Sequence, residues 1–335
     1  MGVAGGLDPS LFAAATFAPN AAAGAVDRKV AAAAAVAVGP SNSPGLPPTI
    51  TPTPAPMLMP TPAMPTPPQP APMDVGWHKL CLQMEGMLMS GPTLQIGFKG
   101  DFRSHAARVG IYLGNVASQP LQGLAVELIV PPATQPALVA SAAAVQDQLA
   151  PRAQALQMVS LELLAPFAQP PVLSVTWKGG GDSGAAGGGA VHLPVFPMRF
   201  ITPWPLGKDD YFRLWRGDGL SESQSKFTFA ASVETAAIKA VLGTNVRLAV
   251  LEGVDPSPTN LCAAGALACK GGATPPAPGG HFCLVRLEIV PNHTAGSDGM
   301  KRSASRLTVR ATSATIGDGL VAALTAHIAG VLPGK

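Results

Sequence analysis

Apolar and polar residues alternate with a period of two in a series of short segments that begins after Trp77. In a β-strand this alternation puts apolar side chains on one face of a sheet and polar side chains on the other. Glycine, proline and asparagine separate the segments, which is typical of an all-β sandwich. The predicted strands are 93–98, 108–113, 124–130, 156–164, 172–177 and 190–196. Residues 178–189 hold seven glycines, and we expect them to form a flexible hairpin loop.

After Trp204 segments with helical spacing alternate with strand-like segments. Near the C-terminus four apolar residues recur at every fourth position, which predicts a helix with one apolar face. These residues are Ile316, Leu320, Leu324 and Ile328. The other predicted elements are helices at 208–216 and 232–242 and strands at 246–251, 263–269, 281–290 and 306–312. A sheet with helices packed on it is an α+β unit, so we predict a β-sandwich at 76–204 and an α+β unit at 205–335.

Residues 1–75 differ from the rest of the chain in composition. Sixteen of the 36 prolines fall within residues 1–73, together with only four charged and two aromatic residues. Such a segment buries too little apolar surface to offset the entropy that ordering costs. We therefore predict a disordered linker over 1–75, with transient helix at 20–39 and extended polyproline geometry at 40–72. The proline-rich part is most simply a spacer, and the alternative is a docking ligand for proline-binding modules.

Charge and cysteine content exclude several classes of protein. The formal net charge is +3, from 22 basic and 19 acidic residues, which is too small for nonspecific nucleic-acid binding. The four cysteines lack the close pairing of a zinc site and are too sparse for a disulfide framework, so we interpret them as buried thiols in a reducing compartment. They are Cys81, Cys262, Cys269 and Cys283. The longest alanine-rich apolar run, 30–38, is about half of a bilayer span. We expect a soluble, cytoplasmic protein with no metal and no transmembrane segment.

The sequence contains none of the motifs that mark common active sites. It has no nucleophile elbow, phosphate-binding loop, dinucleotide fingerprint or metalloprotease helix, and its six histidines are scattered. Catalytic groups meet in space rather than in sequence, so an enzyme stays open as an alternative. We predict that the protein is not an enzyme and uses no cofactor.

Three arginines within apolar strand segments form the most distinctive pattern. Arg306 and Arg310 lie four residues apart on one predicted strand and share a face, whereas Leu307 and Val309 point into the core. Arg286 lies within the preceding predicted strand. If the two strands are neighbours, the three guanidinium groups line one sheet face, where they would bind carboxylates bidentately.

Phe212 and Trp215 lie three residues apart on the predicted helix 208–216 and would add an aromatic wall to this face. Aromatic residues combined with arginine are typical of binding hot spots. The alternative is that each arginine merely solvates a strand face and that Trp215 belongs to the core.

Six segments occur in an order that resembles a known family. They are LQIGFKGDFR at 94–103, GN at 114–115, DYFRLW at 210–215, VDPSPTN at 254–260, CLVRLE at 283–288 and RLTVR at 306–310. Together they resemble the C-terminal appendage, or ear, of α-adaptin, the large subunit of the plasma-membrane clathrin adaptor complex. The resemblance covers about residues 76–332, so residues 1–75 would be the hinge before the ear. The helical trunk of α-adaptin has no counterpart in this sequence, and contact with other adaptor subunits would need a trunk elsewhere.

The resemblance implies an immunoglobulin-like β-sandwich followed by a platform of antiparallel sheet and helices. It implies that the platform binds Asp-Pro-Phe, Asp-Pro-Trp and Phe-x-Asp-x-Phe motifs of endocytic accessory proteins. Their aromatic ring would lie beside Phe212 and Trp215, and Arg286, Arg306 and Arg310 would hold the aspartate and the peptide backbone. The protein would be peripheral at plasma-membrane clathrin-coated pits and would contact the clathrin coat indirectly.

Two features of this sequence depart from the family. Gln224 stands where animal ears have a pocket glutamate, which keeps a hydrogen-bonding group but loses a charge. The segment between Arg286 and Arg306 is longer, through residues 291–301, and would reshape the pocket rim. The alternatives are the appendage of another coat complex, such as β-adaptin or the COPI γ subunit, and a structural proline- and alanine-rich protein with a globular tail.

Overall fold

The computed structural model describes residues 70–180, 186–295 and 301–330. Most of the predicted linker 1–75, including the alanine-rich stretch 20–39, lies outside these residues. The described residues all belong to one compact unit, 64–335. The predicted boundary between residues 204 and 205 therefore stays a prediction.

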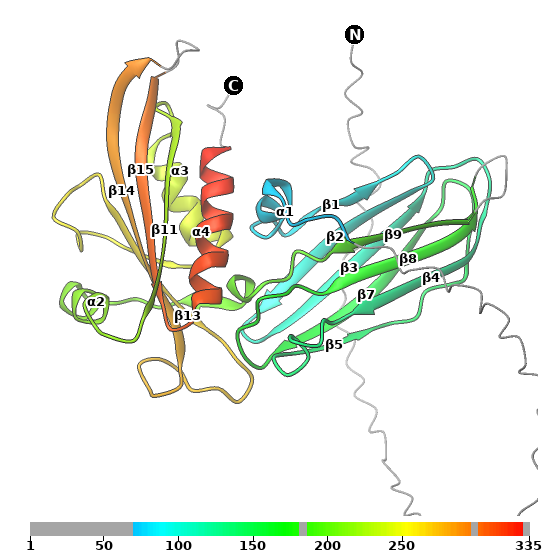
Figure 1. The fold of residues 1–335 in the computed structure, drawn as a ribbon, viewed down its shortest axis with the longest axis horizontal. Coiled ribbons are helices and arrows are strands. Elements are labelled where there is room, and N and C mark those ends of the chain that lie inside the picture. The colour runs from blue at the N-terminus through cyan, green and yellow to red at the C-terminus, as the bar shows by residue number, and fades with distance from the viewer. Residues whose placement is uncertain (1–69, 181–185, 296–300, 331–335) are drawn as a thin grey trace, which may run out of the picture. The chain divides into compact units, whose positions relative to one another are not determined.

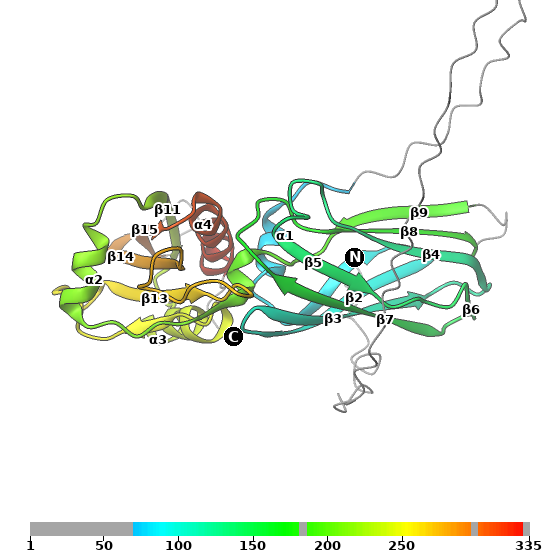
Figure 2. The ribbon, with the colours of Figure 1, turned by 90° about the horizontal axis from the view of Figure 1, so that it is seen from below.

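The first half of the described chain is a β-sandwich of two antiparallel sheets, which Figure 2 shows as two layers. One sheet has the order β1 (Glu85–Ser90), β2 (Leu94–Arg103), β3 (Ala106–Asn115), β7 (Gln154–Leu163) and β5 (Leu138–Ala142). The other has the order β6 (Gln148–Leu149), β4 (Leu121–Ile129), β8 (Val172–Gly179) and β9 (Ala186–His192). The predicted β-sandwich is confirmed, although the sequence pattern did not reveal the short strands β1, β5 and β6.

Alternating side chains of the two sheets fill the space between them. Leu94, Ile96 and Phe98 of β2 are fully buried, as are Leu173 and Val175 of β8. Burial of each such side chain contributes about 1.5–3 kcal/mol, which is why the period-two pattern predicts these strands so well.

The prediction for residues 178–196 was wrong in its bounds. The strand there is Ala186–His192 rather than 190–196, and much of the predicted glycine loop pairs with β8. Trp177 lies opposite Gly187, where an added Cβ would come within 2.4 Å of the indole ring. The ring therefore packs on bare backbone, and glycine, which normally weakens a strand, is required at this position.

The second half is built on one antiparallel sheet with helices (Figure 1). Its strands, in order, are β10 (Ile201–Pro203), β13 (Leu261–Leu267), β14 (His281–Ala295), β15 (Lys301–Ala311) and β11 (Ser221–Ala230), with β12 (Ala249–Leu251) also paired to β13. Its helices are α2 (Lys208–Trp215), α3 (Thr235–Ala240) and α4 (Ala314–Ala329). Helix α4 lies along β11 and β15, and its predicted apolar stripe is fully buried. The predicted α+β platform is confirmed.

Three details of this half differ from the sequence prediction. Strand β11 was not predicted, because its serine-rich sequence carries a weak apolar pattern. The helix predicted at 232–242 begins only at Thr235, since Glu234 has an extended backbone, and it continues as a π-turn at Val241–Asn245. The strand predicted at 246–251 shortens to Ala249–Leu251 because Arg247 adopts a left-handed φ of 66°.

Hydrogen bonds join the sandwich to the platform. The side-chain amide of Asn245 donates to the carbonyl oxygen of Leu82 at 3.2 Å, and Arg247 Nη1 donates to the carbonyl oxygen of Phe102 at 2.8 Å. These bonds satisfy backbone carbonyls of the sandwich with side chains of the platform, so the two halves share a polar seam.

The cysteines and the helices bear on the remaining sequence expectations. All four cysteines are free; three of them are buried, but Cys269 is only half-buried, so its predicted burial was too strong. Within the part of the chain that the structure describes, no group of three metal-ligating side chains comes together, and no helix has the length and apolar character needed to cross a membrane.

Candidate functional site

The two faces of the platform sheet differ in chemistry. On β15, Leu307 and Val309 are fully buried on the face that α4 covers. The opposite face, called here the outer face, carries three residues from each of strands β11, β15 and β14, placed side by side by the strand pairing. These residues are Glu222, Gln224 and Lys226, then Arg310, Thr308 and Arg306, then Leu284, Arg286 and Glu288. The structure therefore brings Gln224 and the three predicted arginines together on one face.

Helix α2 supplies aromatic rings to the outer face. Tyr211 is fully buried, and its hydroxyl donates to the carbonyl oxygen of Val285 at 2.9 Å. Trp215 stacks on Tyr211 with the ring centroids 5.6 Å apart and an interplanar angle of 19°, and Phe212 meets Tyr211 edge-on at 5.4 Å. Phe212 and Trp215 are half-buried, so part of each residue stays exposed to solvent. Tyr211 anchors both rings, a role that sequence reasoning missed although the residue lies within the DYFRLW segment.

Arg310 ties this aromatic group to the sheet. Its Nη1 donates to the carbonyl oxygen of Trp215, the last residue of α2. Its Nε lies 3.6 Å from the Glu222 carboxylate but is buried without a hydrogen-bond partner. Gln224, which is exposed, donates to the same carboxylate at 2.8 Å. Arg310 thus fixes the end of α2, and Glu222 balances its charge.

Arg286 is clamped by a buried carboxylate from the loop before β13. Its Nε donates to Asp255 Oδ2 at 2.8 Å, and the Asp255 side chain is 2% exposed. Asp255 Oδ1 also accepts bonds from the backbone N–H of Ser257 at 3.0 Å and from the Asn260 amide at 3.1 Å. Burial by itself raises the pKa of Asp255, but these three donors outweigh it and lower the pKa below its ordinary value. The Asp-Pro-Ser sequence predicts the turn in which Asp255 accepts the Ser257 N–H, but it does not predict that Arg286 is the partner of Asp255.

Arg306 is the most open of the three arginines, with its side chain 49% exposed. Its Nε donates to the Glu288 carboxylate, which also lies 3.3 Å from Arg286 Nη1. The hydrogen bond from Arg306 lowers the pKa of Glu288. Every predicted arginine thus already has a carboxylate partner. The sequence pattern did not reveal these carboxylate partners, because they come from β11, a loop and β14.

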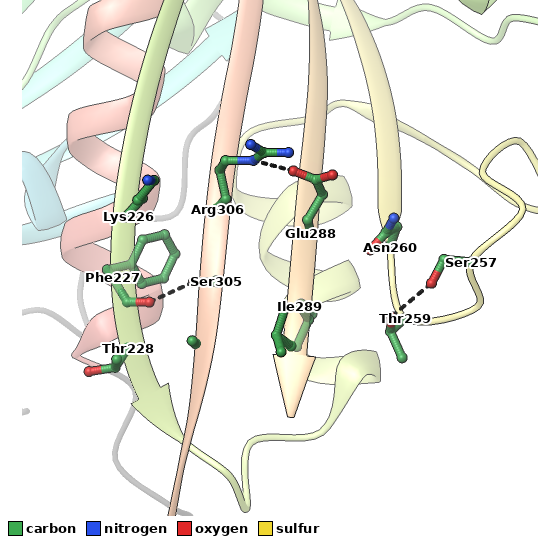
Figure 3. Close-up of a pocket in the computed structure, with 12 residues that line it drawn as sticks. Lys226, Phe227, Thr228, Ser257, Thr259, Asn260, Glu288, Ile289, Ser305 and Arg306 are labelled. Atoms are coloured by element: carbon green, nitrogen blue, oxygen red, sulfur yellow. Dashed lines mark hydrogen bonds and ion pairs between the residues drawn. The ribbon is translucent and has the colours of Figure 1, made fainter. Parts of the chain in front are cut away.

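Beyond Arg306 the outer face is hollowed into a groove of about 590 Å³. Figure 3 shows Lys226, Arg306 and Glu288 on three neighbouring strands at one end of it, with Asn260, Ser257 and Thr259 along one side. Its floor includes Ala304 and the exposed side chain of Val290. Arg306 and Arg310 are four residues apart on β15, or about 13 Å at the rise of a strand. An extended peptide of about five residues would therefore span the distance between Arg310 and Arg306.

The longer segment at 291–301 continues the hairpin of β14 and β15. Pro291 pairs with Ser303, and Ala295 pairs with Lys301. Residues 296–300 lie outside the described chain. The described part of the segment therefore lengthens the platform sheet beyond the groove.

Comparison with protein families covers both halves of the described chain. The model for the adaptin C-terminal domain matches residues 85–193, and the model for the C-terminal domain of alpha adaptin AP2 matches residues 199–328. The sandwich and the platform are therefore those of an adaptin appendage. The chain belongs to the α-adaptin family, and the match at 199–328 favours α-adaptin over the other coat subunits considered from the sequence.

Curated relatives agree with this assignment. The chain is 28% identical over 218 residues to AP-2 complex subunit alpha-1 of Arabidopsis thaliana, a match that covers 64% of this chain and 20% of that protein. It is 26% identical over 257 residues to AP-2 complex subunit alpha-2 of Dictyostelium discoideum, covering 75% of this chain and 24% of that protein. The chain thus spans about a fifth to a quarter of the length of these relatives.

Among solved structures, the GAE domain of GGA2p from Saccharomyces cerevisiae is similar to part of the chain. The sequences are 18% identical, and the match covers 34% of this chain and 99% of that domain with a TM-score of 0.28. A likeness at this level carries no argument about the present chain.

Proposed function

We propose that the outer face of the platform binds short peptide motifs in which an aspartate lies near an aromatic residue, such as Asp-Pro-Phe, Asp-Pro-Trp and Phe-x-Asp-x-Phe. The observation that carries this proposal is the half-buried Trp215 ring, which stacks on the buried Tyr211, together with the bond from Arg310 to the backbone carbonyl of Trp215. A fixed aromatic surface beside cations suits a ligand that offers a ring and a carboxylate. Phe212 lines the same aromatic surface, and Gln224 offers its amide nearby.

In this proposal the arginines have different roles. Arg306, which is half-exposed, meets the aspartate of the motif, while Arg286 and Arg310 hold the frame around it. The groove beyond Arg306 receives the residues on one side of the motif. Because a disordered ligand loses entropy when it docks, one motif binds in the micromolar range or more weakly, at about −8 kcal/mol or less in magnitude. Several motifs in one partner then raise its overall affinity, because the first bound motif increases the effective concentration of the next.

The partners that follow from this proposal are accessory proteins of clathrin-mediated endocytosis, with the clathrin coat contacted indirectly. The protein acts at plasma-membrane coated pits as a peripheral component of vesicle-mediated transport. We also infer that it is a binding scaffold rather than an enzyme. The matches to the adaptin C-terminal domain models support this inference.

The test is a fluorescence-polarisation titration of the full chain with a labelled Asp-Pro-Phe peptide and an Asp-Pro-Ala control peptide. We expect saturable, weak binding to the first peptide only, abolished by Trp215→Ala and by Arg306→Glu. Arg213→Gln is the matched control, because Arg213 lies on the same helix but is exposed and pairs with Asp210. Circular dichroism checks that each variant is folded. Unchanged affinity in a folded Trp215→Ala or Arg306→Glu protein would remove the proposed site.

A further inference from the structure

A second cavity, of about 470 Å³, lies between the sandwich and the platform and shares no lining residue with the groove on the outer face. Met84, Glu85 and Phe102 line it from the sandwich strands and the turn before them. Arg199, Thr244 and Arg247 line it from the other side. The cavity therefore combines apolar walls with two guanidinium groups.

Arg199 is an unusual side chain because it is a buried cation without a carboxylate. The residue is 5% exposed, and its guanidinium carbon lies 4.4 Å from the centre of the Phe102 ring. Its Nη2 donates to the carbonyl oxygen of Gln83, but its Nε is buried and has no hydrogen-bond partner. Burial lowers its pKa to about 10, which leaves the group protonated at neutral pH. A buried charge that lacks a counterion is costly and calls for a compensating group.

Arg247 brings a second cation to the same cavity. Its Nη1 donates to the carbonyl oxygen of Phe102 at 2.8 Å, so both arginines contact Phe102, one at its ring and one at its backbone. Arg247 holds this position with a left-handed φ of 66°, a backbone conformation that is uncommon for arginine.

The other titratable groups at the cavity do not neutralise the two arginines. Glu85, at the rim, is exposed and forms an ion pair with Lys99 at 3.4 Å. The Cys81 thiol is close enough to interact with Arg199, but burial raises its pKa to about 12, so it stays uncharged at neutral pH. Two cations therefore share the cavity with backbone carbonyls and neutral side chains as their partners in the described chain.

We propose that this cavity binds a phosphate group, either as inorganic phosphate or as the monoester of a small molecule. A phosphate monoester carries a charge of about −1.5 to −2 at neutral pH and offers three acceptor oxygens, whereas a carboxylate carries a single negative charge. Guanidinium groups match the geometry of phosphate oxygens. Thr244, which is exposed and also lines the cavity, supplies a hydroxyl donor. This proposal stands apart from peptide binding on the outer face.

The test is isothermal titration of the full chain with inorganic phosphate at constant ionic strength, with parallel arms for glycerol 3-phosphate and acetate. We expect saturable one-to-one binding of inorganic phosphate and weaker or no binding of acetate. Glycerol 3-phosphate distinguishes inorganic phosphate from a phosphate monoester as the ligand. If it binds as tightly as inorganic phosphate, the site accepts monoesters as well. Arg247→Gln should weaken phosphate binding about tenfold or more, the effect of losing one charged donor.

Arg103→Gln is the matched control, because Arg103 is 84% exposed, pairs with Asp101 and does not line the cavity. It should leave phosphate affinity unchanged, as should Trp215→Ala on the outer face. Arg247 is half-buried, so we expect the Arg247→Gln variant to fold. A second measurement needs no variant: added phosphate should raise the melting temperature of the unmodified protein, because a ligand that binds only the folded state stabilises it. Absence of saturable binding, equal weakening by Arg103→Gln, or acetate binding as tight as that of phosphate would overturn the proposal.

Discussion

Replacing Asp255 by alanine tests whether the buried clamp on Arg286 stabilises the platform. The Asp255 carboxylate accepts bonds from Arg286 at 2.8 Å, from the Ser257 N–H at 3.0 Å and from the Asn260 amide at 3.1 Å. The charge-assisted bond contributes about 1.5–3 kcal/mol, and each of the others contributes about 0.5–1.5 kcal/mol. Part of this is offset, because alanine has no charge to desolvate and Arg286 keeps Glu288 at 3.3 Å. We therefore expect Asp255→Ala to lower the free energy of unfolding by about 3 kcal/mol, near the range for breaking a buried ion pair.

The assay is urea unfolding of the full chain, followed by circular dichroism, with Asp210→Ala as the control. Asp210 pairs with Arg213 at the same 2.8 Å, but its side chain is 58% exposed rather than 2%. An exposed pair contributes at most about 1 kcal/mol, so the control should change stability much less. The two pairs thus differ in burial while sharing chemistry and distance. Equal losses in the two variants would refute the reasoning that burial and the added donors give the Asp255 clamp its strength.

Three further expectations follow from the structure. Glu288→Gln should tighten binding of an Asp-Pro-Phe peptide several-fold in a polarisation titration, because Glu288 occupies the donors of Arg306; weaker binding would contradict this. The free energy of unfolding, measured with urea, should fall as the pH drops below about 4.5. Folding lowers the pKa values of Asp255 and Glu288 below their ordinary values of 3.8 and 4.5, so the unfolded chain takes up protons first. A flat stability profile from pH 6 to 3 would argue against this expectation. Gly187→Ala should cost about 1–3 kcal/mol through its clash with the Trp177 ring, whereas Gly188→Ala, whose added Cβ has room, should be nearly neutral; equal effects would contradict the packing argument.

The parts of the fold that could be predicted are those in which one physical pattern dominates. The apolar stripe of α4 and the alternation in β2, β3 and β15 each reflect burial of one face, and this burial contributes most to the stability of these elements. The same period of two put Arg306 and Arg310 on one face. The neighbouring position of Arg286 then followed from the antiparallel pairing of consecutive strands.

The parts that could not be predicted depend on contacts between distant segments. Strand β11 is held by its pairing with β15, and β9 by an indole ring on a glycine, so neither shows in local propensity. The carboxylate partners of the arginines come from three separate elements. Only Glu288 lies close in sequence to an arginine that it contacts, Arg286. Asp255 and Arg286 are 31 residues apart. Which charged residues pair in this way depends on the folded backbone, so neither hydrophobic periodicity nor a short sequence motif predicts the pairing.

The ion pairs of the outer face decide which part of a motif would provide selectivity. If Arg306 already holds Glu288, an incoming aspartate exchanges one carboxylate for another, and little electrostatic free energy is gained in the exchange. The ring of the motif displaces no carboxylate when it meets Trp215, which is half-buried and stacks on Tyr211. Burying an aromatic ring contributes about 1.5–3 kcal/mol, more than the carboxylate exchange. On the proposed outer-face site, replacing the aromatic residue of a peptide should therefore cost more affinity than replacing its aspartate by asparagine.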